Sequence, residues 1–334
     1  MTWILALLAA ILAGGLIYLA TREGNYTVAR SLSMAVDQQA AFDKVRDLRT
    51  WHEWSPWLMH EPATSLEFSD NPDQEGGFYT WDGQMVGAGR LMHVTLDTPT
   101  RIEQKIEFTR PFKSVCRVWW EFSTQDSGET LVSWNMQGQM PFLMRFMTAM
   151  MVPMIEKDYT LGLAMLRGRL DPQAARPVIE FPGEAEFEAT TALTIAFAGG
   201  MEQMVEAMES GFPKLKTQVE ATDNTITAAP FTAYHRVDPK KGQFECDLAI
   251  PATETTEEGE FVRKTLGGGG RYFKVTLQGS YEFLELAWYS AMSHLRMKKL
   301  KLDTSRPSLE VYENDPASVD HSNEIRTALY LPIK

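Results

Sequence analysis

Cysteine is scarce in this sequence, with only Cys116 and Cys246 in 334 residues. The two are far apart and neither lies in a CxxC or Cys/His spacing, so neither a disulfide framework nor a zinc site is expected. The six histidines form no HxxxH, HExxH or His-plus-carboxylate triad spacing. We therefore predict no metal site and no cofactor.

Positive charge is also in deficit, because the chain carries a net charge of -12. The 24 acidic and 16 basic residues from Glu180 onward leave -8 there and -4 in the preceding part. An acidic surface argues against nucleic acid as a partner and favours cationic ligands.

Apolar residues are plentiful, at 44% of the chain against 23% charged residues. This balance is typical of folded, globular protein. A length of 334 residues suits two domains better than a single core, so we expect two domains.

The N-terminal stretch WILALLAAILAGGLIYLA, residues 3–20, has no charge and as a helix matches one hydrocarbon thickness. A cleaved signal peptide is the alternative. The absence of a basic leading region, and Tyr18 near a cut after Ala20, favour an uncleaved single-pass anchor over residues 1–22. The basic residues that follow favour soluble domains in the cytoplasm. They are Arg22, Arg30, Lys44, Arg46 and Arg49.

The next part of the chain, residues 25–170, has the pattern of one α+β domain. A strand at 26–37 precedes a short helical stripe, and alternating segments between 76 and 136 predict antiparallel strands. A long helix is expected from about 142 to 170, kinked at Pro153. Residues 171–184, with three prolines, are interpreted as a linker.

The motif WHEWSPWLMHEP, residues 51–62, places Trp51, Trp54 and Trp57 three residues apart. Pro56 ends any helix there, so the rings are expected to form an aromatic corner over the sheet. They are predicted to wall an apolar cavity rather than to hold a metal or haem. Seven of the eighteen methionines fall between Met140 and Met165, and flexible thioethers suit such a wall.

Several stretches of this part resemble the START/polyketide-cyclase (SRPBCC) superfamily: YTVARSLSMAVDQQAAFDKVRDLRTWHEWSPW, GGFYTWDG, VGAGRLMHV and EKDYTLGLAMLRGRL. The resemblance implies a helix-grip fold, in which an antiparallel sheet curls around a long C-terminal helix with a deep apolar cavity between them. It implies a ligand class and not a reaction. Plain core packing of the same aromatic and methionine residues is the alternative. The candidate cavity residues are Trp54, Trp57, Trp81, Trp120, Trp134 and Met147.

The last part, residues 185–334, contains an internal repeat at an offset of eighty residues. IAFAGGMEQMVEAM (195–208) aligns with VTLQGSYEFLELAW (275–288), and PFTAYHRVDP (230–239) with PSLEVYENDP (307–316). Each half is predicted as strand, helix, strand, strand, which gives a pseudo-twofold α+β domain.

Positions that differ between the two halves are free to serve a site. In this alignment Met201 becomes Tyr281, Met208 becomes Trp288, Ala233 becomes Glu310 and His235 becomes Tyr312. The second half therefore carries the polar and aromatic candidates. A carboxylate ringed by aromatic side chains attracts an organic cation through charge and ring quadrupoles together.

FTAYHRVD, GGRYFKVTLQGSYEFLELAW and LEVYENDP with EIRTALYLPIK resemble the gyrase-inhibitor-like effector-binding domain, which also occurs in AraC- and MerR-type regulators. The resemblance implies a cleft for amphipathic, often cationic molecules, with a glutamate at its floor that matches Glu310. The chain has no helix-turn-helix ahead of this domain, so a DNA-binding role is not expected. The candidate cleft residues are Glu310, Tyr312, Trp288, Tyr281, Tyr234 and His235.

Together these features predict a membrane-anchored protein that binds a small hydrophobic or amphipathic ligand, with no catalytic residue assigned. One alternative is a hydrolase or cyclase with Glu310 as general base. Another is a scaffold whose clefts are vestigial. The sequence does not determine the ligand, the oligomeric state or the coupling between the two clefts.

Overall fold

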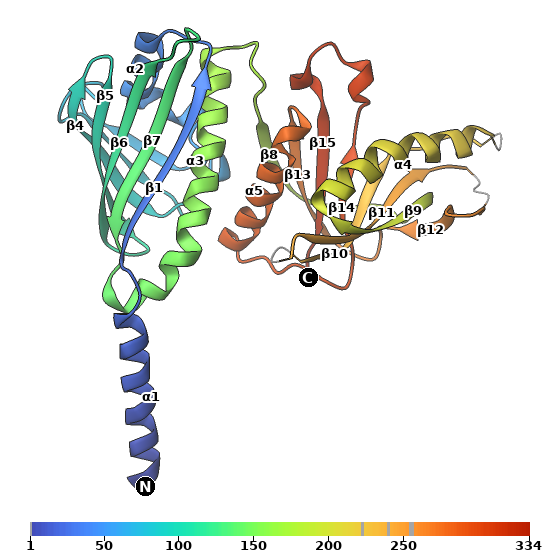
Figure 1. The fold of residues 1–334 in the computed structure, drawn as a ribbon, viewed down its shortest axis with the longest axis horizontal. Helices are drawn as coiled ribbons and strands as arrows, with labels where there is room; N and C mark the ends of the chain where they lie inside the picture. The colour runs from blue at the N-terminus through green and yellow to red at the C-terminus, as the bar shows by residue number, and fades with distance from the viewer. Residues whose placement is uncertain (1, 222–223, 239–240, 254–256) are drawn as a thin grey trace. The chain divides into compact units, whose positions relative to one another are not determined.

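The computed structural model describes residues 2–221, 224–238, 241–253 and 257–334, and the chain divides into two compact units, Met1–Ala174 and Ala175–Lys334 (Figure 1). Met1, the first residue of the predicted anchor, lies outside the described residues. Each unit contains one antiparallel sheet with helices. The predicted α+β architecture with two domains is confirmed.

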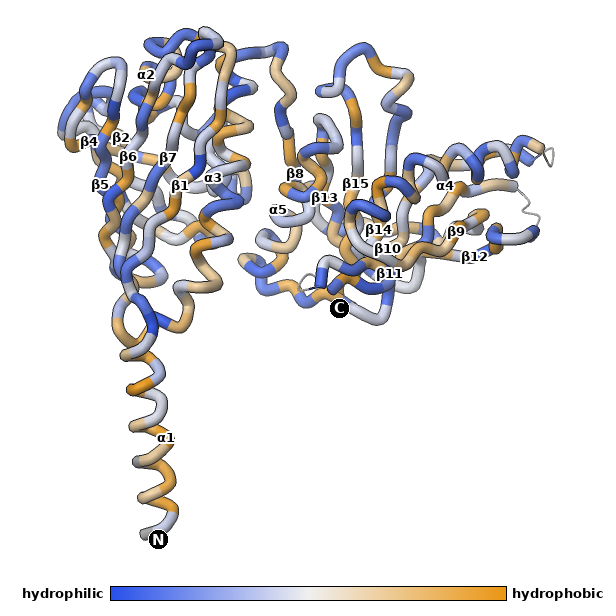
Figure 2. The backbone as a smooth tube through the Cα atoms, viewed as in Figure 1, coloured by the Kyte–Doolittle hydropathy of each residue, from blue (hydrophilic) through white to orange (hydrophobic). Residues whose placement is uncertain are grey.

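Helix α1, Thr2–Ala20, is the apolar N-terminal segment. Its window from Trp3 to Ala20 has a mean hydropathy of 2.3 and none of it is buried within the structure (Figure 2). By length and composition it is apolar enough to cross a membrane. A signal sequence would have the same properties.

The first unit is built on a seven-stranded sheet with the order β1-β7-β6-β5-β4-β3-β2. Alternation of side chains puts Trp120 on its buried face and Trp119 on the outer face, as the sequence predicts. Strand β2 has no counterpart in the predicted pattern. The strands are β1 (Asn25–Met34), β2 (Ser65–Phe68), β3 (Phe78–Asp82), β4 (Ala88–Asp97), β5 (Arg101–Arg110), β6 (Ser114–Thr124) and β7 (Thr130–Gln139).

The other helices of this unit form two groups along the chain, one between β1 and β2 and the other after β7. Asp37 begins the first one by accepting hydrogen bonds from the amides of Gln39 and Ala40. The predicted long helix is correct only from Thr148, because residues 142–147 form a 3₁₀ helix ahead of it. The helices are α2 (Gln38–Arg46), η1 (Leu48–Glu53), η2 (Leu58–His60), η3 (Phe142–Met147) and α3 (Thr148–Leu170).

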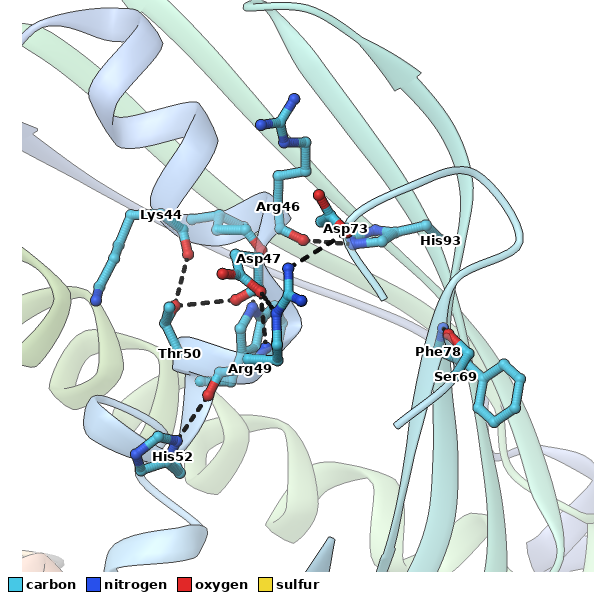
Figure 3. A network of polar contacts seen from close by, with 12 residues as sticks. Lys44, Arg46, Asp47, Arg49, Thr50, His52, Ser69, Asp73, Phe78 and His93 are labelled. Carbon is cyan, nitrogen blue, oxygen red and sulfur yellow. Dashed lines mark hydrogen bonds and ion pairs between the residues drawn. The ribbon is translucent and has the colours of Figure 1, made fainter. Parts of the chain in front are cut away.

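A polar network fixes the turn that delivers the first tryptophan (Figure 3). The Thr50 hydroxyl donates to the carbonyls of Lys44 and Asp47, at 3.0 and 2.9 Å. The buried His93 ring lies 2.8 Å from the Arg46 carbonyl through Nε2. The Trp51 indole then donates to the Val45 carbonyl at 2.8 Å, which satisfies its polar atom inside the core.

The second unit is built on an eight-stranded sheet with the order β12-β9-β11-β10-β14-β15-β13-β8. Its centre repeats the same strand order on either side of the β10/β14 pair, as a pseudo-twofold requires. The strands are β8 (Val178–Ala185), β9 (Thr190–Gly200), β10 (Phe231–Asp238), β11 (Gln243–Pro251), β12 (Val262–Leu266), β13 (Tyr272–Gln278), β14 (Ser308–Tyr312) and β15 (Arg326–Pro332). The helices are α4 (Met201–Ala221), η4 (Tyr281–Phe283), α5 (Leu284–Met297), η5 (Pro316–Ser318) and η6 (Ser322–Glu324).

The predicted linker 171–184 is too long, because strand β8 begins at Val178 and pairs with β13. Pro182 suggested a linker, yet an edge strand tolerates a residue without an amide proton. The pairing shifts register between Lys274 and Thr276, opposite the segment that contains Pro182. The connection between α3 and β8 is therefore 171–177, and the boundary between the two units falls within it, after Ala174.

The sheet register corrects the alignment of the repeat by one residue. Pro251 pairs with Ala192, and its repeat equivalent Pro332 pairs with Tyr272. Tyr272 follows Ala192 by eighty residues, the offset of the repeat. In the neighbouring pairs Leu248 faces Thr232, and its equivalent Leu329 faces Glu310.

The position equivalent to Glu310 is therefore Thr232 and not Ala233. By the same shift the equivalent of Tyr312 is Tyr234 and not His235. Thr232 also pairs directly with Glu310, so the two equivalent residues lie opposite each other at the pseudo-twofold axis.

His294 holds helix α5 against the sheet. Its ring stacks on Phe181 with a centroid distance of 4.0 Å and lies 5.2 Å from the ring of Phe273. Burial lowers the pKa of His294 to about 4. The neutral ring is therefore the form that fits this layer.

We expect acidification to loosen this layer. The pKa of His294 is lower in the folded state than in the unfolded state, so its contribution is complete above about pH 6.5 and is lost as the pH falls towards 4. The loss should be about 3 kcal/mol. Hydrogen exchange of the α5 amides in the full chain at pH 7 and pH 4.5 tests this. His294→Phe should keep its protection at the lower pH, and parallel losses in both proteins would contradict the prediction.

Candidate functional sites

The first unit contains a cavity of about 300 Å³ between the sheet, helix α3 and the aromatic segment after α2. This size is at the lower end of small-ligand sites. Its wall is almost wholly apolar. The lining includes Trp51, Trp57, Tyr79, Trp81, Leu91, Ile106, Phe108, Phe112, Trp134, Met136, Met140, Met144, Met147, Met151, Ile155 and Tyr159.

Four of the six predicted cavity residues line this space: Trp57, Trp81, Trp134 and Met147. The other two, Trp54 and Trp120, are not in the lining. Both have no exposed surface, and their rings meet edge to face with centroids 5.8 Å apart. They belong to the solid core behind the cavity.

Trp51 also lines the cavity, although it is not among the six candidate cavity residues. The three tryptophans are not equivalent because the segment is a 3₁₀ helix followed by an irregular turn, with Trp54 as its C-terminal cap. Trp51 and Trp57 contact the cavity from either side of that turn. A spacing of three residues does not show which of the tryptophans faces the cavity unless the type of helix is known.

Few polar groups face the cavity. The Trp57 indole donates to Asp158 Oδ2 at 3.1 Å, and the Tyr26 hydroxyl lies 3.3 Å from Cys116 Sγ. Burial raises the pKa of Tyr26 and of Cys116, so both stay protonated at neutral pH. Lys113 is the charged residue of the lining, and Ser55, Ser114 and Gln139 are its other polar residues, so most of the wall offers apolar contact.

The second site surrounds Glu310, whose side chain is buried beneath helices α4 and α5 with 2% of the residue exposed. Its carboxylate accepts a hydrogen bond from the Trp288 indole at 2.5 Å and one from the Tyr312 hydroxyl at 2.8 Å. The Tyr234 hydroxyl also hydrogen-bonds to it. The Thr232 hydroxyl lies 2.8 Å from the Tyr312 hydroxyl and completes the network.

No basic residue is among these partners. Burial raises the pKa of Glu310, and the hydrogen bonds from Trp288, Tyr312 and Tyr234 only partly offset this effect. Burial and the nearby carboxylate also raise the pKa of Tyr281, to about 12. The site thus holds a desolvated carboxylate that a positive charge would stabilise.

The rings around Glu310 form a continuous aromatic enclosure. Tyr312 meets Tyr281 at 5.8 Å and the α4 residue Phe212 at 5.3 Å, both edge to face. Tyr234 meets Trp288 at 5.6 Å in the same manner. Five of the predicted cleft residues therefore come together, although their rings close over the carboxylate instead of lining an open cleft.

The sixth predicted cleft residue, His235, is not in this site. His235 directly follows Tyr234 in β10, so alternation along the strand puts it on the opposite face, with Ala233 and the partner of Ala233, Asp247. There His235 Nε2 lies 2.7 Å from Asp247, which also binds Lys264 at 2.7 Å. Burial opposes ionisation of Asp247, but these two hydrogen bonds hold its pKa below the ordinary value. The repeat alignment that was wrong by one residue had placed His235 where Tyr234 belongs.

Among the described residues no group of three or more His, Cys, Asp or Glu side chains is arranged to hold a metal ion. His52 and His60 lie in the tryptophan segment but belong to different 3₁₀ helices, η1 and η2. His60 is buried, and His52 is exposed and bonds to the Arg49 carbonyl at 2.7 Å.

Comparison with known families assigns both units. Residues 26–171 match the family described as polyketide cyclase / dehydrase and lipid transport. Residues 184–334 match the GyrI-like small molecule binding domain. The two resemblances indicated by the sequence are thereby confirmed, and the chain is a fusion of these two domain types. No curated protein sequence matches the chain significantly.

Solved structures resemble part of the chain at low sequence identity. The C-terminal domain of EcmrR is 16% identical, with 48% of this chain and 98% of that one covered and a TM-score of 0.38. MLL2253 from Mesorhizobium loti is 12% identical, with 45% and 99% covered and a TM-score of 0.35. SAV2435, solved with tetraphenylphosphonium, is 12% identical, with 46% and 94% covered and a TM-score of 0.34.

Proposed function

We propose that this fusion of a polyketide-cyclase-type domain and a GyrI-like domain is a membrane-anchored binding protein for hydrophobic small molecules. The observation that carries the proposal is the cavity of about 300 Å³, lined mainly by aromatic, aliphatic and methionine side chains, with Lys113 as the charged residue of its lining. Such a wall accepts apolar ligands of varied shape.

Helix α1 supplies the anchor in this proposal. Its 18-residue apolar window is long enough to span the hydrocarbon layer. Arg22 and Arg30 follow it closely and carry positive charge, so we place the two domains on the cytoplasmic side.

The second domain binds an amphipathic cation at Glu310 in this proposal. A ligand that displaces the Trp288 indole from Glu310 would supply the positive charge that the site lacks. The faces of Tyr281 and Tyr312 would then contact the apolar part of the ligand. Burial in one domain and charge recognition in the other make the two sites selective for different ligands.

Filling the cavity should abolish ligand capture in the first domain. Ile106 lines the cavity from strand β5, and its neighbour Lys105 extends to the outer face. The full chain should be extracted from its host membrane into nanodiscs, and native mass spectrometry should detect a bound hydrophobic molecule. Ile106→Trp should reduce its occupancy at least about tenfold, because the larger ring takes the ligand's volume.

The matched control is Lys105→Trp, which adds the same ring outside the cavity and should retain the ligand. Glu310→Gln should also retain it if the ligand lies in the first domain. A ligand present at equal occupancy in wild type and Ile106→Trp would contradict the proposal for this cavity.

A further inference from the structure

One end of the first domain adjoins the attachment of helix α1. The lining residue Phe112 is exposed at this end, so the cavity reaches the surface here, and we call this opening the mouth. Three segments meet at this end: the β3–β4 connection at 83–87, the β5–β6 connection at 111–113, and residues 140–147. Val86, Phe112 and Met144, one from each segment, line the cavity. Strand β1 also begins here, because Asn25 pairs with Gln139.

The connection between α1 and this end is short. Only residues 21–24 separate the end of α1 at Ala20 from the start of β1 at Asn25. Four residues reach at most about 14 Å. The Gly24 carbonyl accepts a hydrogen bond from the Met140 amide at 2.8 Å, and the Arg22 carbonyl accepts one from Arg145 at 3.4 Å. If α1 spans a bilayer, the mouth is tied to its surface.

Large apolar side chains are exposed at the mouth. Leu143 is 68% exposed, Phe146 is 56% exposed and Phe112 is 55% exposed. Phe142 beside them is also exposed. Exposed rings and a leucine grouped around the opening of an apolar cavity are unusual on a surface that faces water. They suit the boundary between lipid headgroups and acyl chains.

The two segments that carry the exposed rings have the charge that an anionic lipid surface attracts, although Glu23 and Glu61 add negative charge at the same end. Segments 110–115 (RPFKSV) and 140–150 (MPFLMRFMTAM) contain three basic residues and no acidic one. Arg110 pairs with Asp82, while Lys113 and Arg145 carry the positive charge beside the exposed rings. Long basic side chains of this kind favour the headgroup region.

We infer that this mouth docks on the bilayer, with Phe112, Leu143 and Phe146 inserted at the headgroup boundary, so that the cavity exchanges its ligand directly with the membrane lipid. The inference rests on the proposed anchor and on the proposed apolar ligand. It adds the surface that faces the membrane and the route by which the ligand enters.

Site-directed fluorescence on the full chain in vesicles of phosphatidylcholine and phosphatidylglycerol tests the docking. Both native cysteines are buried, so a new cysteine can be labelled with a polarity-sensitive fluorophore. Leu143→Cys reports the mouth, and Ser127→Cys reports the exposed β6–β7 turn at the opposite end of the same sheet. Leu12→Cys, in the middle of α1, reports the anchor.

Docking predicts blue-shifted emission at position 143 and loss of about half its intensity to a spin label near the lipid headgroup. Position 127 should show neither effect. Quenching at 12 without quenching at 143 would overturn the docking and leave the anchor intact. Failure at both 12 and 143 would overturn both, whereas quenching at 143 alone would support docking without the anchor. Shielding of 143 from iodide without quenching by lipid would indicate a second protein copy on the mouth and would overturn the inference.

The functional readout is the rate at which a fluorescent fatty acid moves from vesicles into the protein. Leu143→Asp places a charge where the mouth enters the headgroup boundary and should slow loading about tenfold. Val94→Asp makes the same change at an exposed apolar residue of β4 away from the mouth and should leave the rate unchanged. Equal rates for the two variants would overturn the proposed entry route.

Discussion

Replacing Trp54 with alanine should destabilise the first domain by about 3 to 5 kcal/mol. Trp54 has no exposed surface, and its ring packs against those of Trp51, Trp120 and Trp134 at centroid distances of 4.7 to 5.9 Å. Because it lies in the core behind the cavity, the truncation leaves a void that neighbouring rings cannot fill. The loss would take a large part of a typical domain's stability.

Tryptophan fluorescence during urea unfolding of the full chain measures this effect, since eight of the nine tryptophans precede residue 170. The matched control is Trp119→Ala, on the outer face of β6 where the ring contacts Arg101 and Arg117. It should cost less than about 1 kcal/mol, the range of exposed cation–π contacts. Similar losses for the two variants would show that Trp54 does not support the core.

Trp57 separates stability from ligand capture in the same segment. It is half-buried and lines the cavity, and its indole donates to Asp158. Its truncation enlarges the cavity and should affect ligand occupancy more than stability. Trp54 and Trp57 differ in this way because the irregular turn between them places the first ring in the core and the second on the cavity wall.

The faces of the strands were predictable from the sequence because side chains alternate with a period of two. Trp119 and Trp120 are adjacent, and alternation alone separates the outer ring from the buried one. The two domain types were predictable from their motifs. The repeat predicted the order of elements in the second domain, because each half has to bury the same helix against the same strands.

The exact strand register, to within one residue, was not predictable from the sequence. The alignment of Glu310 with Ala233 was wrong by one position. Leu248 pairs with Thr232, and its repeat equivalent Leu329 pairs with Glu310, so Thr232 is the equivalent of Glu310. His235 was selected through the same misalignment, because it directly follows Tyr234 and therefore shares the face of Ala233 and Asp247. In both errors the wrong residue is the neighbour of the right one and points to the opposite face of the sheet. A register shift of one residue has this effect in a strand.

Replacing Glu310 with glutamine should weaken the binding of a lipophilic cation about 10- to 100-fold while leaving the fold intact. The change removes the charge but keeps the shape. The amide oxygen can accept from Trp288, and the amide nitrogen can donate to the Tyr312 oxygen. Tyr312 can then turn its own hydroxyl proton to Thr232, which lies 2.8 Å away.

The same change should alter the dependence of stability on pH. The pKa of Glu310 is higher in the folded state than the unfolded value of about 4.5, so the wild type loses stability as the pH rises from 4.5 through the folded pKa. Glutamine does not titrate and should remove this loss. At pH 7 the variant should therefore be at least as stable as the wild type without ligand.

Calorimetric titration of the full chain with tetraphenylphosphonium measures the affinity, because this cation has charge and rings but no hydrogen-bond donor. Tetraphenylborate has the same shape with the opposite charge, and it should bind the variant better than the wild type. Glu313→Gln, an exposed partner of Lys274 beyond the end of β14, is the matched control and should keep the wild-type affinity.

Equal affinity of the cation for wild type and Glu310→Gln would remove charge recognition from the second domain. A hydrophobic ester that is hydrolysed by the wild type and only bound by the variant would instead assign Glu310 as a general base. The two results differ in what the carboxylate does once a ligand displaces Trp288. In one it balances a charge, and in the other it takes a proton from water.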